Sequence, residues 1–99
     1  MPAYVVALIE SISDAETYKS YVAQVQATLD PFRGRFLARV PGPELLEGEG
    51  APSRAVILEF PDVESARRWH SSDAYQPVMR LRQSASKGKL LLLPGYAPA

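Results

Sequence analysis

The side chains best suited to chemistry in this sequence are two aromatic residues and one cation in its C-terminal half, Trp69, Tyr75 and Arg82. An aromatic pair and a fixed cation beside one pocket can hold a planar molecule or one that bears a carboxylate. The alternative is structural, because Trp and Tyr residues are often core residues with one satisfied polar atom, and an Arg stem can cover apolar surface. The residue types leave both interpretations open.

Two further side chains are candidates for proton transfer. His70 is the only histidine, and imidazole is the side chain whose ordinary pKa suits proton transfer near neutral pH. Glu59 lies in an apolar segment, where an unpaired carboxylate would be costly. We therefore predict that Glu59 forms an ion pair with Arg82 or Arg54. The alternative is a general base, a desolvated carboxylate whose pKa is raised.

The sequence lacks the residues on which several other chemistries depend. It contains no cysteine, which excludes a thiol nucleophile, an iron–sulfur cluster and a cysteine-based zinc site. It has no glycine-rich phosphate loop and no nucleophile elbow. His70 has neither a second histidine nor a carboxylate at ligand spacing. We expect no metal and no cofactor.

Charge and hydropathy restrict the partners. The chain has 99 residues, with 11 basic and 11 acidic side chains and a formal net charge of zero. Because neither half is strongly basic, nucleic acid and anionic membranes are not expected partners. The longest apolar runs, at 4–9 and 90–93, are too short to span a bilayer. We expect residues 1–99 to form one soluble, cytoplasmic domain.

The apolar periodicity predicts elements in the order βαββαβ. Strands are expected at 3–10, 34–40, 54–60 and 89–93, and helices at 14–29, 63–70 and 74–87, the last two separated by a break at 71–73. Ser13 and Glu16 predict a capping box for the first helix, and Asp62 is the predicted N-cap of the second. Tyr18 and Tyr21 lie on the inner stripe of the first helix, where they are core residues or line a pocket beneath it.

The second strand differs from the others in its pattern. Strict alternation predicts that its side chains divide between the two faces of the sheet. One face would carry Phe36, Ala38 and Val40, and the other Arg35, Leu37 and Arg39. A half-exposed strand of this kind is expected near the edge of a sheet.

The order of elements predicts the arrangement of layers. Right-handed crossovers place both helical segments on one side of a four-stranded antiparallel sheet, which is the ferredoxin-like α+β fold. The strands at 3–10, 54–60 and 89–93 are apolar on both faces, yet the helices can cover only one. A second copy packed on the open face would cover the other. We therefore predict a homodimer formed through the open face of the sheet.

Several segments together resemble the family numbered 1330 among the domains of unknown function, in the dimeric α/β-barrel superfamily. They are Gly34-Arg35-Phe36-Leu37-Ala38, Leu46-Glu47-Gly48, residues 56–61, Ala66-Arg67-Arg68-Trp69 and Ser72-Asp73-Ala74-Tyr75-Gln76, with Arg82 seven residues after the tyrosine. The resemblance covers nearly the whole chain. It implies a ferredoxin-like monomer whose sheets pair into a barrel, with a pocket between each sheet and its helices.

The resemblance does not supply a reaction. Members of the wider superfamily include cofactor-independent monooxygenases of aromatic polyketides, haem-degrading enzymes and lactone isomerases, and fold alone cannot choose among them. His70 matches none of their histidine motifs, which argues against a haem-ligand role.

Three functions remain as hypotheses. The first is a homodimer that binds a small aromatic or carboxylate-bearing molecule through Trp69, Tyr75 and Arg82, with Tyr18 and Tyr21 as further lining residues. The second is an enzyme of the same architecture, either a cofactor-independent monooxygenase or an isomerase that uses Glu59 or His70. The third is a non-catalytic structural or interaction module. A closed core around the trio favours the third, and an open cavity favours the first two.

Overall fold

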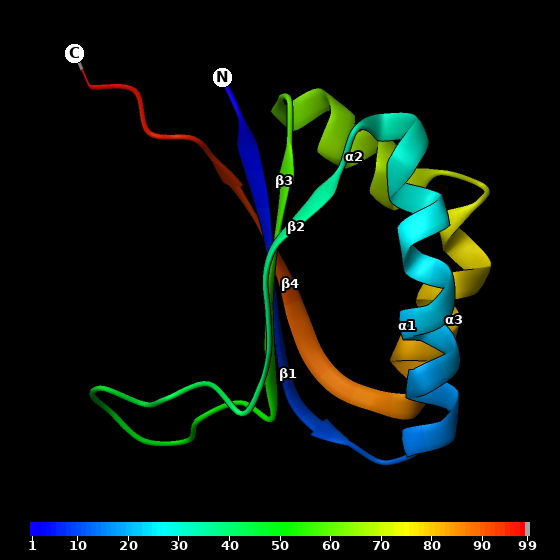
Figure 1. Cartoon of the computed structure of the whole chain (residues 1–99), viewed down its shortest axis with the longest axis vertical. Helices are drawn as coiled ribbons and strands as arrows, with labels where there is room; N and C mark the ends of the chain where they lie inside the picture. Colours follow the sequence, from blue (N-terminus) through cyan, green and yellow to red (C-terminus); the bar gives the residue numbers. More distant parts are fainter. Residues whose placement is uncertain (99) are drawn as a thin grey trace.

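The computed structural model describes residues 1–98 and has the ferredoxin-like order of strands and helices (Figure 1). The strands are β1 (Ala3–Ile12), β2 (Arg35–Pro41), β3 (Arg54–Phe60) and β4 (Ser86–Pro94). The helices are α1 (Ala15–Leu29), the short 3₁₀ turn η1 (Asp30–Phe32), α2 (Val63–Ser71) and α3 (Tyr75–Ala85). The predicted α+β fold class is confirmed.

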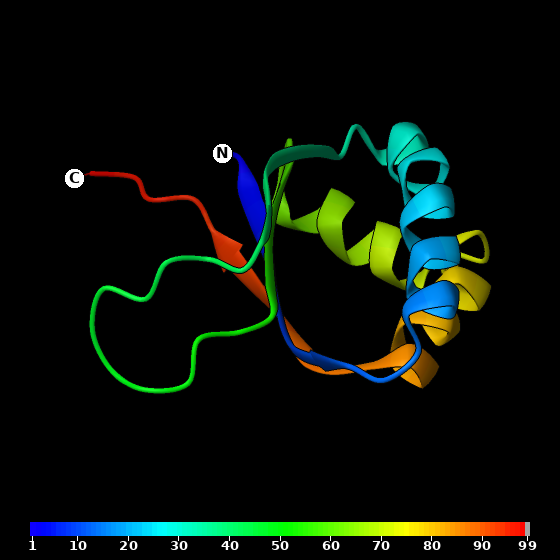
Figure 2. The ribbon, with the colours of Figure 1, turned by 60° about the horizontal axis from the view of Figure 1, so that its bottom comes forward.

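The four strands form one antiparallel sheet in the order β2-β3-β1-β4. Figure 1 shows the sheet edge-on, with all helices on one side of it. Figure 2 shows that the segment between β2 and β3 and the C-terminal tail extend from the other side. The layers therefore agree with the prediction that the helices leave one sheet face uncovered.

The uncovered face is apolar over its central strands. Leu91 and Leu93 of β4 are 42% and 45% exposed there, and Ile57 of β3 is half-buried. The register pairs Val6 of β1 with both Ile57 and Leu91, so these side chains lie in one row across the sheet. No helix in the described residues 1–98 has the length and hydropathy needed to cross a membrane.

The core lies between the sheet and the helices. Its largest fully buried side chains are Trp69, Tyr75, Phe60, Ile9 and Leu29. One inner stripe of α3 contributes to it, because Tyr75, Val78, Arg82 and Ala85 are all buried. The Trp69 indole N–H donates to Thr28 Oγ1 at 3.0 Å, which satisfies the one polar atom of this fully buried side chain.

The predicted capping box of α1 is wrong. The N-cap is Asp14, whose carboxylate accepts from the Thr17 backbone N–H at 3.1 Å and from the Thr17 hydroxyl at 2.7 Å. The Ser13 hydroxyl instead donates to the Ala85 carbonyl at 3.1 Å, which links the start of α1 to the end of α3. Asp and Ser both cap helices well. Because the Ser13 hydroxyl is engaged with Ala85, the cap lies one residue later, at Asp14. The predicted cap at Asp62 is confirmed.

The ends of two elements also differ from the prediction. Helix α3 stops at Ala85, and residues 86–87 belong to β4 rather than to the helix. Strand β1 continues beyond a bulge to Ile12, because Ser11 pairs with Lys87 and Ile12 with Ser86. The extra pairing between these strands explains both shifts.

A bulge in β2 changes which side chains face the helices. Phe36 pairs with Leu58, and after the irregularity at Leu37 the register places Arg39 opposite Val56. Directly opposite residues share a sheet face, so Phe36 and Arg39 both point toward the helices. The strict alternation expected for this strand is therefore wrong, because one extra residue reverses the faces.

Candidate ligand-binding site

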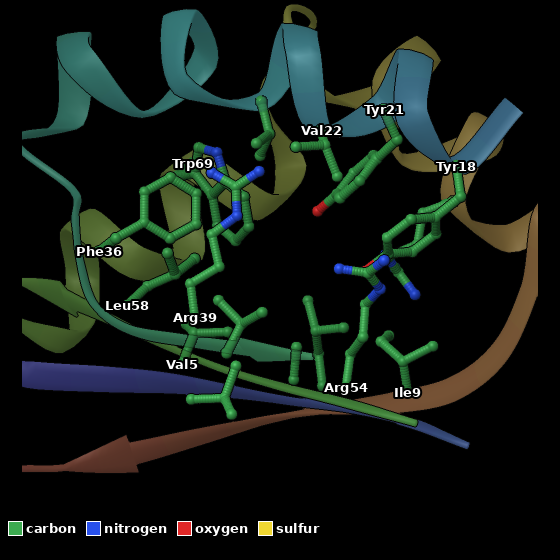
Figure 3. Close-up of a pocket in the computed structure, with 16 residues that line it drawn as sticks. Val5, Ile9, Tyr18, Tyr21, Val22, Phe36, Arg39, Arg54, Leu58 and Trp69 are labelled. Carbon is green, nitrogen blue, oxygen red and sulfur yellow. The ribbon is translucent and has the colours of Figure 1, made fainter. Parts of the chain in front are cut away.

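A pocket lies between the sheet and α1, and we call it the arginine pocket after Arg39, Arg54 and Arg82, which line it (Figure 3). Its other lining side chains are mostly apolar and come from all four strands and from the helices: Val5, Ala7, Ile9, Tyr18, Tyr21, Val22, Val25, Phe36, Val40, Val56, Leu58, Trp69 and Leu90. The space that the centre of a water-sized molecule can reach is about 40 Å³. This is enough for a few water molecules, at roughly 10–15 Å³ each.

Arg82 reaches the pocket from the inner face of α3. Arg82 is only 7% exposed, and its Nε has no hydrogen-bond partner among residues 1–98. The guanidinium carbon lies 5.9 Å from the centre of the Tyr21 ring. A buried charged donor that lacks an acceptor costs free energy, and such groups are rare in folded proteins. An acceptor atom of a bound molecule would satisfy it.

Arg39 and Arg54 approach the pocket from the sheet, as Figure 3 shows. The guanidinium carbon of Arg39 lies 5.1 Å from the ring centre of Phe36, and that of Arg54 lies 5.2 Å from the ring centre of Tyr18. The ion pairs within residues 1–98 join other residues, namely Arg35 with Glu59, Arg68 with Glu64, and Lys87 with Glu10. All three pocket arginines thus contact aromatic faces rather than carboxylates.

The two tyrosines of the pocket are neutral hydrogen-bonding groups near neutral pH. Burial raises the pKa of Tyr18, and the charges of Arg54, Arg82 and Arg39, in that order, oppose the rise. Burial also raises the pKa of Tyr21 far above its ordinary value, and the neighbouring Tyr75 hydroxyl adds to the rise. The three guanidinium groups therefore act on one hydroxyl, that of Tyr18, which places them in a single electrostatic environment.

The structure brings four of the five predicted ligand-binding residues to this pocket. Tyr18, Tyr21, Trp69 and Arg82 line it. Tyr75 lies behind them: it is fully buried, its ring centre is 4.1 Å from that of Trp69, and its hydroxyl is 3.1 Å from the Tyr21 hydroxyl. Tyr75 therefore supports two lining residues without lining the pocket itself.

The two predicted proton-transfer residues lie outside the pocket. Glu59 faces the uncovered side of the sheet and pairs with Arg35, whose Nη2 and Nε lie 2.6 and 2.8 Å from Glu59 Oε1. The predicted ion pair exists, but the expected partners, Arg82 and Arg54, are wrong because both lie on the helix-covered side of the sheet. His70 is exposed on α2, and its ring centre lies 5.8 Å from that of Tyr75.

The environment of His70 still reflects the nearby cation. Partial burial lowers its pKa, and the charge of Arg82 lowers it further. His70 borders a shallow groove beside Trp69 and Leu90. Within residues 1–98 there is no cluster of three or more His, Cys, Asp or Glu side chains that could hold a metal ion.

The sequence reasoning missed Arg39 and Arg54 as pocket residues. Arg39 could not be found from alternation, because the bulge at Leu37 reverses the faces. Arg54 could have been found: it has the same parity as Val56 and Leu58, which face the core. A charged residue in phase with core residues at a strand end is a signal for the rim of a pocket.

Solved structures share the fold at low sequence identity. A protein of unknown function from Rhodopseudomonas palustris has a TM-score of 0.79 and 18% identity, and the match covers 98% of this chain and 84% of that one. A dimeric ferredoxin-like protein of unknown function from Jannaschia sp. CCS1 has a TM-score of 0.75 and 10% identity, with 98% and 100% covered. SnoaB, a cofactor-independent oxygenase from Streptomyces nogalater, has a TM-score of 0.64 and 16% identity, with 98% and 94% covered.

These likenesses establish the fold, which other proteins use for different purposes. A search of curated proteins gave no match. The model of the family described as a domain of unknown function, DUF1330, matches residues 2–96, which is nearly the whole chain. The resemblance seen in the sequence motifs is thereby confirmed, and the chain belongs to the DUF1330 family.

Proposed function

We propose that the protein binds a small organic molecule in the arginine pocket. The observation that carries this proposal is Arg82, whose buried Nε has no acceptor within residues 1–98 and whose side chain lines a pocket with mostly apolar walls. Binding sites of this kind combine apolar walls with a few well-placed polar groups. Here Arg82 is the anchor, and the Tyr18, Tyr21 and Trp69 rings contact the ligand.

The size of the pocket indicates how a ligand enters. About 40 Å³ is too small for an aromatic ring while the side chains stay as they are. Arg39 is exposed and Arg54 is half-buried, and both have long flexible stems. Outward rotation of these two side chains opens the pocket at the expense of their contacts with the Phe36 and Tyr18 rings, which contribute about 0.5–2 kcal/mol each.

Binding can be tested by filling the pocket. Ala7 lines it from β1, so Ala7→Leu should block binding, whereas Ala23→Leu adds the same bulk on an exposed position of α1. Amide spectra of the labelled protein are recorded with a panel of planar organic molecules, neutral and charged. We expect signals of pocket residues to shift in the wild type and in Ala23→Leu, but not in Ala7→Leu. The absence of any shift across the panel would favour the non-catalytic interaction module.

We also propose that two copies pair through the uncovered face of the sheet. The apolar row formed by Val6, Ile57 and Leu91 supports this, because contiguous exposed apolar surface marks contact sites. Similar folds described as dimeric, including the Jannaschia protein, add support. Two sheets packed face to face lie about 10 Å apart and bury the side chains between them.

Sedimentation tests the pairing directly. We expect the wild type to be a dimer at micromolar concentration and Leu91→Lys to be a folded monomer, because a charge would be buried in the apolar contact. Ala23→Lys, on the exposed side of α1, should remain a dimer. A wild-type monomer at this concentration contradicts the proposal.

A cofactor-independent oxygenase is the second candidate function. The fold shared with the Streptomyces nogalater oxygenase favours it. Oxygen consumption is measured over a panel of phenols and quinols, and a flat response rejects this candidate. The isomerase alternative has less support, because Glu59 and His70 are not among the residues that line the pocket.

A further inference from the structure

The arginine pocket has a charge imbalance that limits what it can bind. Its lining contains three arginines and no aspartate or glutamate. Arg82 is buried, and a buried charge without a counter-ion is unfavourable. Ion pairs within residues 1–98 do not compensate any of the three. A ligand that neutralises the pocket must therefore carry negative charge.

The cations come from two layers of the fold, which suggests two negative groups on the ligand. Arg82 belongs to α3. Arg39 and Arg54 rise from the sheet (Figure 3). In Figure 3 the Tyr21 hydroxyl points into the space between the Arg39 and Arg54 side chains. A single carboxylate on Arg82 would leave the two cations of the sheet uncompensated.

The walls between these cations favour a flat apolar body. The rings of Phe36, Tyr18 and Tyr21 each lie within 6 Å of one of the three guanidinium carbons. Aromatic faces contact other aromatic groups well in offset or edge arrangements. A small inorganic anion would satisfy the charges but would leave these apolar walls unfilled.

We propose that the ligand is a planar aromatic dianion, with one acidic group on the buried Arg82 and a second on Arg39 and Arg54 at the mouth. This inference rests on the proposed binding function and names the class of its ligand. Guanidinium groups suit it because each can donate two parallel hydrogen bonds to a carboxylate. Arg39 and Arg54 then have two roles: they rotate outward to admit the ligand, and they bind its second acidic group.

The test compares three molecules of the same shape and different charge. Terephthalate carries two negative charges, terephthalamic acid carries one and terephthalamide carries none at pH 7. Titration calorimetry should give the tightest binding for terephthalate and a loss of about tenfold for each charge removed, as expected for charge-assisted hydrogen bonds. The affinity for terephthalate should also fall as the salt concentration rises.

Variants separate the two ends of the site. Arg39→Gln and Arg54→Gln should each weaken terephthalate binding about tenfold and leave terephthalamide unchanged. Arg82→Gln should weaken both acids; if it does not fold, Arg82→Lys keeps the charge and should lose affinity because it lacks Nε. Arg80→Gln, which removes an exposed cation of α3 outside the pocket, is the matched control and should behave as the wild type.

Each contrary outcome has a distinct meaning. If terephthalamide binds as tightly as terephthalate, the dianion inference is wrong and the proposed binding function stands. If inorganic phosphate binds as tightly as terephthalate, the inference that the ligand has an aromatic body is wrong. If no planar molecule binds, both the proposed function and this inference are overturned.

Discussion

The hydroxyl groups of Tyr21 and Tyr75 lie 3.1 Å apart, which joins α1 to α3 behind the arginine pocket. The Tyr75 ring is fully buried, and its centre lies 6.4 Å from that of Tyr21 in an edge arrangement. Tyr75→Phe removes one hydroxyl and leaves the other without this partner. We expect it to lower the free energy of unfolding by about 1–2 kcal/mol, measured by urea denaturation.

A double-mutant cycle isolates the bond between the two hydroxyls. Tyr21→Phe, Tyr75→Phe and the double variant should give a coupling free energy of about 0.5–1.5 kcal/mol, because the double variant leaves no orphaned hydroxyl. Additive losses would mean that the two hydroxyls contribute separately to stability.

The Trp69 indole gives a second prediction about the packing of α2 against α1. Its N–H donates to Thr28 Oγ1, and the Thr28 hydroxyl donates to the Val25 carbonyl at 2.6 Å. Thr28→Val keeps the shape but leaves the buried indole N–H without an acceptor, so it should destabilise the protein by about 1–3 kcal/mol. Thr28→Ser keeps the acceptor and should cost less in the same denaturation experiment. A loss for Ser that exceeds the loss for Val would assign the effect to the methyl group instead of the hydroxyl.

The single histidine permits a direct measurement of the field around Arg82. Burial and the Arg82 charge hold the pKa of His70 below its ordinary 6.5. An NMR titration of the His70 ring should therefore show a midpoint below 6.5, and Arg82→Gln should raise it part of the way back, since burial remains. A midpoint above 6.5 would contradict this environment.

The same shift has a consequence for stability with a definite sign. The unfolded chain binds the His70 proton at a higher pH than the folded chain does. The contribution of His70 to the free energy of unfolding is therefore fully present above pH 6.5 and is lost as the pH falls below it. His70→Gln should reduce the slope of unfolding free energy against pH in this range. An unchanged slope would assign the pH dependence to carboxylates.

The fold could be predicted from the sequence because several signals agree. Strands that are apolar on both faces, helix stripes at intervals of three and four, and punctuation by Pro and Gly all favour the same topology. The burial of Arg82 also follows from spacing, since it falls on one stripe with Tyr75, Val78 and Ala85. An arginine on such a stripe indicates a site, although its chemistry needs the other lining residues.

The candidate site was only partly predictable, because its charges depend on tertiary geometry. The bulge at Leu37 leaves no mark in the alternation of β2, yet it places Arg39 in the pocket. The pairing of Glu59 with Arg35 depends on cross-strand register rather than on distance along the chain. Both features are set by how β2 aligns with β3, which sequence periodicity does not fix.

Gly34 gives a last prediction, about the turn that positions β2. A Cβ added there would lie 2.7 Å from Phe60 Cε1 and 2.9 Å from Leu29 Cδ2, and both of these side chains are fully buried. Neither can move without disturbing the core, so Gly34→Ala should destabilise the protein by about 1–3 kcal/mol through overpacking. Gly34→Ala combined with Leu29→Ala should lose less than the sum of the two single variants, because the truncated leucine makes room for the new methyl group. Additive losses in urea denaturation would show that the clash with Phe60, rather than the one with Leu29, causes the loss.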